Sequence, residues 1–175
     1  MQGEEEMILL PLLMVAGFAI DNTWHVEAGG ASAFIVPSNR VEVVDGDTLK
    51  VQIPGLPNVF GKDLLVRISG IDAPELHSKN TCERMRAIQA RDYLSNLIAG
   101  TQWISIEDVK RDKYFRLLGS LFIDGKTVSY EMLRKGYAVP YYGKTKPAVD
   151  WCSFKCIAGA SGTTCAPVAK DERVK

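Results

Sequence analysis

The chain has 175 residues, of which 46% are hydrophobic and 24% are charged. This length and composition suit one domain with a buried core, and the sequence contains no internal repeat or long low-complexity tract that would predict a repeat array. The formal net charge is zero, but residues 34–175 contain all 21 Lys and Arg residues and only 16 of the 21 acids. This mild basic excess is compatible with a polyanionic partner, although it does not identify one.

The first 33 residues are predicted to form a signal peptide or an apolar N-terminal segment. Residues 7–20 carry no charge, and the run is about as long as the apolar core of a signal peptide and short for a transmembrane helix. Small residues place a cleavage site after Ala19 or after Ala33. We therefore expect an exported protein, periplasmic or secreted, with no stable membrane span.

One feature of this segment opposes export. The acids at residues 4–6 precede the apolar run, where a signal peptide favours positive charge. Translation that starts at Met7 would remove the conflict. If the segment is not a signal, it is a disordered or buried apolar stretch, and the protein is cytoplasmic.

Alternating apolar and polar residues predict two strands in the next part of the chain. The residues from Thr48 to Ile53 alternate after the Asp45-Gly46 turn, and a second strand runs from about Lys62 to Ile71. On the second strand Arg67 lies on the face opposite Val66, so this face must hold more than core.

The middle of the chain predicts a helix over residues 81–99, where apolar residues recur at helical spacing and Gly100 stands at the C-terminal end. Two strands follow, at about residues 102–109 and 116–123, joined by a charged connection.

The last part of the chain predicts smaller elements. After a turn at Asp124-Gly125 we expect a short helix over residues 128–135 and a last extended piece over residues 137–142. Small polar residues after Trp151 suggest a loosely ordered tail.

The order of these elements predicts an α+β fold that is mainly β. It fits a five-stranded OB-fold barrel with a helix inserted between strands 3 and 4 and a short helix after strand 5. The domain is expected over residues 34–151, followed by a cysteine-containing tail over residues 152–175.

The chain has an even number of cysteines, which fits disulfides in an oxidising compartment. Four cysteines allow three connectivities, and the sequence does not choose between them. A zinc site is a weaker alternative because the paired Cys-x2-Cys spacing is missing, and free buried thiols are expected if the chain stays in the cytoplasm. The four candidates are Cys82, Cys152, Cys156 and Cys165.

Three short polar clusters interrupt the apolar strands, at residues 45–48, 67–75 and 112–116. Each contains carboxylates, and the last two also contain arginines. Carboxylates bind a hard cation, whereas arginines bind a planar or tetrahedral anion. Few substrates other than a phosphodiester require both, so the clusters predict a single site.

The stretch from Val41 to about Tyr142 resembles the thermonuclease family, the micrococcal or staphylococcal nuclease-like enzymes. Each matching motif is weak alone, but the four occur in the family's order on the expected elements. They are Asp45-Gly46-Asp47-Thr48, Val66-Arg67, Ile71-Asp72-Ala73-Pro74-Glu75 and Asp112-Lys113-Tyr114-Phe115-Arg116.

The resemblance implies a site for one Ca²⁺ ion. Asp47 and Asp72 would be its carboxylate ligands, the Ala73 carbonyl the third protein ligand, and water would supply the rest. Asp45 would lie outside the direct ligands and hold waters or ligands in place.

The resemblance also assigns the catalytic groups. Glu75 would act as the general base or orient the attacking water, and Arg67 and Arg116 would grip the scissile phosphate from two sides. The physical reason is that negative charge grows on the equatorial oxygens of a phosphodiester during in-line attack, and positive groups stabilise that growth.

Substrate contacts follow from the same resemblance. Lys113 and Tyr114 match positions that contact a terminal phosphate, and Tyr142 or its neighbour Tyr141 matches a tyrosine that packs on a base or sugar. Ordinary barrel packing is the alternative role for these tyrosines. His77 has no counterpart role in the family and is interpreted as a surface histidine.

Three features depart from the family pattern. Ala73 replaces a threonine, which leaves the carbonyl intact, and Phe115 replaces a glycine, so the turn that aims Arg116 can differ. The C-terminal helix of the family is not evident, and the cysteine-bearing tail takes its place.

The expected function is that of a calcium-dependent nuclease that hydrolyses DNA and RNA with little sequence preference. Single strands should be favoured, products should carry 3′-phosphate ends, and the protein should be a monomer. The alternative is a catalytically silent nuclease-like OB module that binds nucleic acid or a protein partner; a third is an export-linked structural or conjugation accessory protein. The clustered acids argue against the binding module, because acids repel phosphate unless a cation intervenes, and the accessory protein would leave these acids unexplained.

Overall fold

The computed structural model describes residues 33–112, 114, 116–146, 148–159 and 162–169, with only the backbone described at 154–159, 162–166 and 168–169. The predicted signal segment therefore lies outside the described residues except for Ala33, as do Lys113 and Phe115. Within these ranges no helix has the length and apolar character needed to cross a membrane.

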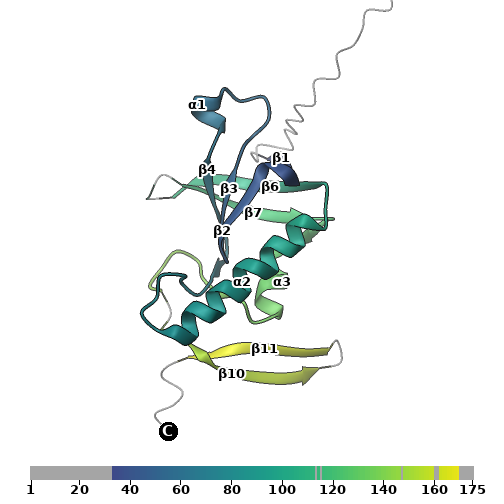
Figure 1. The fold of residues 1–175 in the computed structure, drawn as a ribbon. Coiled ribbons are helices and arrows are strands. Elements are labelled where there is room, and N and C mark those ends of the chain that lie inside the picture. The colour runs from purple at the N-terminus through teal and green to yellow at the C-terminus, as the bar shows by residue number, and fades with distance from the viewer. Residues whose placement is uncertain (1–32, 113, 115, 147, 160–161, 170–175) are drawn as a thin grey trace, which may run out of the picture.

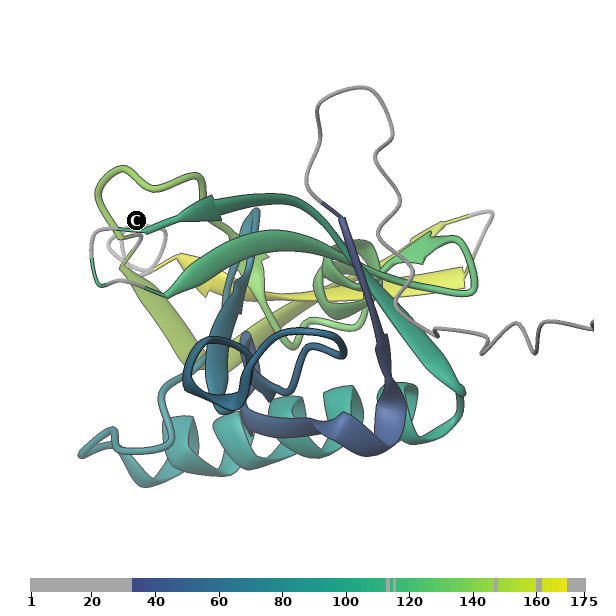
Figure 2. The same cartoon turned by 90° about the horizontal axis from the view of Figure 1, so that it is seen from above.

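The described residues form a mixed α+β fold that is mainly β. Its main sheet has the strand order β1-β6-β7-β4-β3-β2, with β8 paired to β7, and the sheet curls over the core (Figures 1 and 2). Neighbouring strands pair antiparallel except β4 and β7, which are parallel. The strands are β1 (Phe34–Pro37), β2 (Val41–Asp45), β3 (Thr48–Val51), β4 (Leu64–Ile68), β6 (Trp103–Arg111), β7 (Leu117–Ile123) and β8 (Lys126–Thr127).

Helix α2 (Thr81–Ala99) confirms the sequence prediction at both ends. It begins where the Asn80 side chain accepts hydrogen bonds from the backbone N–H groups of Cys82 and Glu83, and it ends at Gly100. Its buried residues, Ala87, Ala90, Leu94 and Ile98, follow the helical spacing that predicted it. The other helices are α1 (Asn58–Gly61), α3 (Val128–Arg134) and the 3₁₀ helix η1 (Ser38–Arg40).

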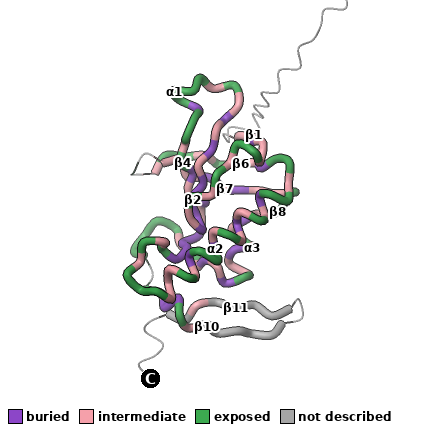
Figure 3. Tube along the Cα trace, in the orientation of Figure 1, coloured by how far each residue is buried: buried purple, intermediate pink, exposed green. Residues whose placement is uncertain are grey.

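The core lies between the curled sheet and the helices α2 and α3, where the buried residues of the trace gather (Figure 3). Leu49 and Ile68 enter it from the sheet, Leu94 from α2 and Met132 from α3, and all four are almost fully buried. Since α2 also contacts β2, the core fixes the helix beside the Asp45-Gly46 turn at the end of that strand.

Gly46 is where this packing is tightest. A Cβ atom at this position would lie 2.8 Å from the Cβ atoms of both Ala73 and Ala90. Glycine is therefore required in the Asp45-Gly46 turn by the close approach of two other segments. The same approach brings the first two polar clusters together, because Ala73 follows directly after Asp72.

The predicted strand over residues 62–71 is interrupted in the structure. Strand β4 ends at Ile68, and Gly70, with a φ of 81°, turns the chain into the short strand β5 (Ile71–Asp72). Strand β5 pairs with β9 (Val139–Pro140) outside the main sheet. This pairing, which lies within the extended piece predicted over residues 137–142, brings the tyrosine-containing segment beside Asp72.

The prediction of a loosely ordered tail is wrong, because the described residues 149–159 and 162–169 form an antiparallel hairpin. Strand β10 (Val149–Gly159) pairs with β11 (Gly162–Ala169), below α2 in the view of Figure 1. Strand β11 consists mainly of small residues, which give little of the alternation that signals a strand. The five-strand count was also too low, since the main sheet of the described residues alone has seven strands.

One disulfide joins Cys82, in the first turn of α2, to Cys152 in β10, with 5.8 Å between their Cα atoms. It attaches the hairpin to the helix across a sequence separation of 70 residues. The backbones of Cys156 and Cys165 are register partners in β10 and β11. Once Cys82 and Cys152 are joined, the connectivity that remains pairs Cys156 with Cys165. This second disulfide stays a prediction.

Replacing Gly46 with alanine should destabilise the fold by about 1–3 kcal/mol, because the new methyl group overlaps two buried alanines. The measurement is the free energy of unfolding in urea. Gly100→Ala is the matched control: its Cβ would meet the carbonyl oxygen of Asn96 at 3.5 Å, an ordinary contact. Equal stabilities of the two variants would contradict this account of the turn.

Candidate functional site

The predicted polar residues converge at one end of the sheet. They line a pocket of about 300 Å³ that is open to the surface. The turn after β2, strand β4, strand β5 and its loop, the β6–β7 connection and the loop after β9 all contribute. The lining residues are Asp45, Asp47, Thr48, Arg67, Asp72, Glu75, Tyr114, Arg116, Tyr141 and Lys146.

Arg67 is the centre of this acidic pocket. Its Nη1 forms an ion pair with Asp47 Oδ2, and its Nη2 lies 3.0 Å from Asp72 Oδ1 and 3.1 Å from the carbonyl oxygen of Ile71. Burial lowers the pKa of Arg67, but the two carboxylates raise it by more than burial lowers it. The pKa of Arg67 is therefore above its ordinary value. Both predicted carboxylate ligands of the cation are therefore held by the arginine that was predicted to bind phosphate.

Asp47 is fully engaged. Its Oδ1 accepts a hydrogen bond from the Thr48 hydroxyl at 2.8 Å, and its Oδ2 accepts one from the Ala73 backbone N–H at 3.1 Å. The buried Ala73 is thus fixed beside Asp47 by its own amide. These bonds join the first and second polar clusters.

Asp72 is buried and only half satisfied. Its Oδ1 is bonded to Arg67, but its Oδ2 has no hydrogen-bond partner among the described residues and lies 3.3 Å from Lys146 Nζ. Burial is the main cause that raises the pKa of Asp72 above its ordinary value; the charge of Asp47 adds to the rise, and Lys146 and Arg67 oppose it. The Oδ2 atom is thus a buried acceptor facing positive charge.

Arg116 is positioned by Asp112 in the connection between β6 and β7. The Asp112 carboxylate accepts hydrogen bonds from the backbone N–H groups of Tyr114 and Arg116 and, at 2.8 Å, from Arg116 Nε. The guanidinium also lies 5.4 Å from the centre of the Tyr114 ring. Although Phe115 is outside the described residues, Arg116 reaches the pocket that holds Arg67.

The sequence carries a local signal for the role of Asp112. An aspartate before a turn often bonds to the backbone two residues further along the chain. The bond from Tyr114 N–H to Asp112 is of that kind. Asp112 orients Arg116 within its own hairpin.

Glu75 and Lys146 form the outer edge of the pocket. The Lys146 Nζ lies 2.7 Å from Glu75 Oε1, and the Glu75 side chain is 57% exposed. Burial lowers the pKa of Lys146, but the hydrogen bond to Glu75 and the charge of Asp72 raise it more. Lys146 was missed from the sequence because its position depends on the β5–β9 pairing, which leaves no local pattern.

Asp45 lies beside these groups and bonds to its own turn, since its Oδ1 accepts from the Gly46 backbone N–H at 2.8 Å. Burial, with the charges of Asp47 and Glu75, raises the pKa of Asp45 to about 6. His77 is exposed, as interpreted from the sequence, yet its charge acts on Asp45.

A second cleft of about 470 Å³ adjoins the acidic pocket. The two share Arg67, Arg116, Tyr114 and Tyr141 as lining residues. The Arg67 guanidinium lies 5.8 Å from the Tyr141 ring, and the second cleft continues over Tyr142, which is 80% exposed. The two arginines therefore stand at the boundary between an acidic pocket and an aromatic cleft.

The atoms that could bind a metal ion are of the type that hard cations prefer. They are carboxylate oxygens, and one of them, Asp72 Oδ2, is buried without a hydrogen-bond partner. In the part of the chain that is described, however, no group of three or more Asp, Glu, His or Cys side chains is arranged to hold a metal ion. Arg67 and Lys146 occupy the carboxylates instead, so a cation would have to displace positive charge.

Fold and site together define a mixed α+β domain whose cleft combines buried carboxylates with arginines. Residues 65–151 match the family described as "Staphylococcal nuclease homologue". This match confirms the resemblance seen in the motifs, and through this segment the chain belongs to the staphylococcal nuclease-like family. The match includes Arg67, Asp72, Glu75 and Arg116 and begins after the Asp45–Thr48 turn.

Curated relatives agree with the family. The chain is 34% identical over 97 residues to the SPbeta prophage-derived endonuclease YokF of Bacillus subtilis. The matched stretch covers 54% of this chain and 31% of YokF. It is 33% identical over 97 residues to endonuclease YncB of Bacillus subtilis, covering 54% and 43%. A probable endonuclease, LCL3 of Komagataella phaffii, is 31% identical over 93 residues, covering 51% and 40%. The chain thus spans less than half the length of these relatives.

Replacing Asp45 with asparagine should stabilise the cation-free protein at neutral pH. The pKa of Asp45 is about 6 in the folded protein against an ordinary value of 3.8, so the folded state binds the proton more tightly than the unfolded chain. The stability of the wild type should therefore fall as pH rises from about 4 to about 6. Asp45→Asn should be more stable by about 1–2 kcal/mol at pH 7, as measured by urea unfolding in a chelator.

Asp92→Asn, which changes an exposed carboxylate on α2, is the control for this measurement. A stability difference between Asp45→Asn and wild type that stays constant between pH 4 and pH 7 would contradict the raised pKa.

Proposed function

We propose that this domain is a nuclease that hydrolyses phosphodiester bonds of DNA and RNA. The observation that carries the proposal is the position of Arg67 and Arg116 at the boundary between the acidic pocket and the aromatic cleft. A phosphodiester placed there would meet two guanidinium groups, with room for a base on one side and for water on the other. The family match and the relatives named endonucleases support the same class of reaction.

The two arginines bind the phosphate in this proposal. A guanidinium has five N–H donors, and those of Arg67 that are not used by Asp47, Asp72 or the Ile71 carbonyl remain for the equatorial oxygens of the phosphate. Arg116 keeps Nε on Asp112 and uses its terminal nitrogens. Because negative charge grows on these oxygens during the attack, the arginines stabilise the transition state more than the bound substrate.

Glu75 is the group placed to take the proton of the attacking water. It lines the acidic pocket and is exposed, and its Oε1 is held by Lys146. The water oxygen forms a bond to phosphorus as the bond from phosphorus to the 5′ oxygen breaks. The proton from water goes to Glu75, and the leaving 5′ oxygen takes a proton from solvent water and departs as a 5′ hydroxyl, which leaves a 3′ phosphate.

We propose a single Ca²⁺ ion as the cofactor, held by Asp47, Asp72 and the Ala73 carbonyl with Asp45 beside them. The unpartnered Asp72 Oδ2 and the all-oxygen donor set support this choice. When bound, the ion would supply additional positive charge beside the reacting phosphate.

The aromatic cleft supports low sequence preference and a preference for single strands. Tyr141 and Tyr142 present rings that stack on any base, and such stacking requires unpaired bases. We also propose that the curled sheet is a variant of the predicted OB-type barrel, a fold whose face and loops commonly hold nucleic acid. Lys113 remains a proposed phosphate contact, and the protein a proposed monomer.

The Cys82–Cys152 disulfide supports action outside the cytoplasm, because disulfides persist in oxidising compartments. We therefore propose a periplasmic or secreted enzyme.

A catalytically silent module that binds nucleic acid or protein is the second candidate. The observation that favours it is that Arg67 and Lys146 already pair with the carboxylates, which leaves the acidic pocket nearly neutral without a cation. This module would bind denatured DNA without hydrolysing it.

Hydrolysis of denatured DNA by the purified protein tests the proposal. Cleavage should require Ca²⁺ and stop in EDTA, and Arg116→Ala should lower kcat by on the order of 10²-fold because one charge-stabilising donor is lost. Glu75→Gln should lower it similarly. Arg91→Ala, which removes an arginine paired with Asp92 on α2, should leave kcat unchanged.

Hydrolysis that persists in EDTA and in both site variants would contradict the mechanism. A mobility shift of the DNA without any hydrolysis would favour the binding module.

A further inference from the structure

Lys146 places a positive charge in the acidic pocket from a distant segment. It lies on the loop between β9 and β10, and its Nζ lies 2.7 Å from Glu75 Oε1 and 3.3 Å from Asp72 Oδ2. Neither the motifs nor the family resemblance assigns it a role. The ammonium is thus a cation that the chain itself supplies to the site.

The oxygen that Lys146 faces is the one that nothing else satisfies. Asp72 Oδ1 is bonded to Arg67, and Asp47 accepts from Thr48 and Ala73, whereas Asp72 Oδ2 is buried and has no hydrogen-bond partner among the residues that the structure describes. A buried carboxylate oxygen that faces a positive charge without a bond is stabilised by charge alone. For a cation to bind this oxygen, its ion pair with Lys146 is the interaction that has to break.

We propose that Lys146 is a built-in counter-cation that a divalent ion displaces from Asp72 and Glu75. This inference rests on the proposed cation site. An ammonium and a divalent ion cannot both lie against Asp72 Oδ2, because their charges repel at such distances. Lys146 therefore stabilises the cation-free pocket and weakens the binding of the cation by competition.

The surroundings of Lys146 allow this exchange. Its side chain is 49% exposed, so its flexible stem can swing the ammonium into solvent. Displacement would also free Glu75 to accept a proton. The loop that carries Lys146 begins at Tyr141 and Tyr142, which line the aromatic cleft, so that cation binding and the substrate cleft are joined by one short segment.

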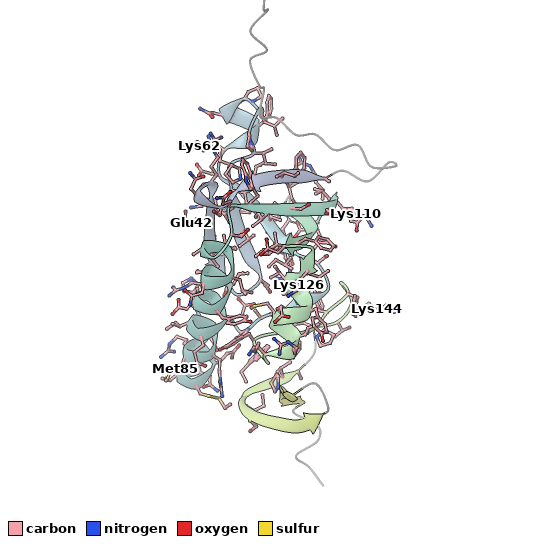
Figure 4. The ribbon with its side chains drawn as sticks, turned by 90° about the vertical axis from the view of Figure 1, so that its right-hand side faces the viewer. Glu42, Lys62, Met85, Lys110, Lys126 and Lys144 are labelled. Carbon is pink, nitrogen blue, oxygen red and sulfur yellow. A yellow bond between two sulfur atoms is a disulfide. The ribbon has the colours of Figure 1, made fainter. Side chains whose placement is uncertain are left out.

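Calcium binding, measured by isothermal titration calorimetry on the whole protein, tests the competition. Lys146→Met removes the charge and keeps the length of the stem, and it should bind Ca²⁺ about tenfold more tightly than wild type. Lys144→Met is the matched control, because Lys144 lies on the same loop at the outer edge of the molecule (Figure 4) and belongs to neither cleft. It should bind Ca²⁺ as wild type does.

A second measurement needs no substitution and so does not depend on the folding of a variant. Acetylation of Lys146 by acetic anhydride, followed by peptide mass spectrometry, should become several-fold faster when Ca²⁺ is added, while that of Lys144 stays constant. Unchanged acetylation of Lys146 in saturating Ca²⁺ would overturn the displacement.

The two proposals fail in different ways. If wild type binds Ca²⁺ and cleaves DNA but Lys146→Met binds the ion no more tightly, the nuclease proposal stands and the competition is wrong. If no variant binds Ca²⁺ or cleaves DNA, the proposed cation site and this inference are both wrong.

Discussion

The structure of the site depends on one constraint: two buried carboxylates lie close together and must be neutralised. Asp47 and Asp72 are 6% and 3% exposed, and Arg67 bridges them from the strand between. Removing one partner from such a buried cluster is costly, because it leaves a charge without compensation. Arg67 therefore holds the turn after β2, strand β4 and strand β5 in one arrangement, and the other functional groups are placed relative to it.

The remaining charged pairs surround this centre, and they become more exposed toward the rim of the pocket. Asp112 holds Arg116 within a single hairpin, whereas Lys146 and Glu75 meet at the rim from segments far apart in the sequence. The inner pairs are buried and the outer pair is half exposed, so the outer pair is the easier one to exchange. The carboxylates of such a site are paired without a cation, and its outer pair leaves a position for the proposed cation.

The sequence predicted those features whose signals are local. Helix α2 was predicted correctly because its apolar spacing and its C-terminal glycine lie within one stretch of chain. The polar clusters were expected to share a site, and Arg67, Asp72, Glu75 and Arg116 do line one pocket. Their catalytic roles remain predictions from the resemblance.

The features that were missed depend on pairing between distant segments. Lys146 reaches the pocket only because β5 pairs with β9, and the hairpin of β10 and β11 is attached through Cys152 to a helix 70 residues earlier in the sequence. Neither arrangement leaves a periodic pattern near the residue concerned. The glycine of the Asp45-Gly46 turn was interpreted as a turn residue, although close packing against Ala73 and Ala90 is what requires it.

The central claim is that the phosphate binds between Arg67 and Arg116, at the boundary of the two clefts. A crystal structure of the protein with Ca²⁺ and a short single-stranded oligonucleotide that carries a hydrolysis-resistant phosphorothioate linkage tests it most directly. The account predicts that one linkage lies within hydrogen-bond distance of both guanidinium groups, with an adjacent base against Tyr141 or Tyr142. An oligonucleotide bound elsewhere, with neither arginine contacting a phosphate, would contradict it.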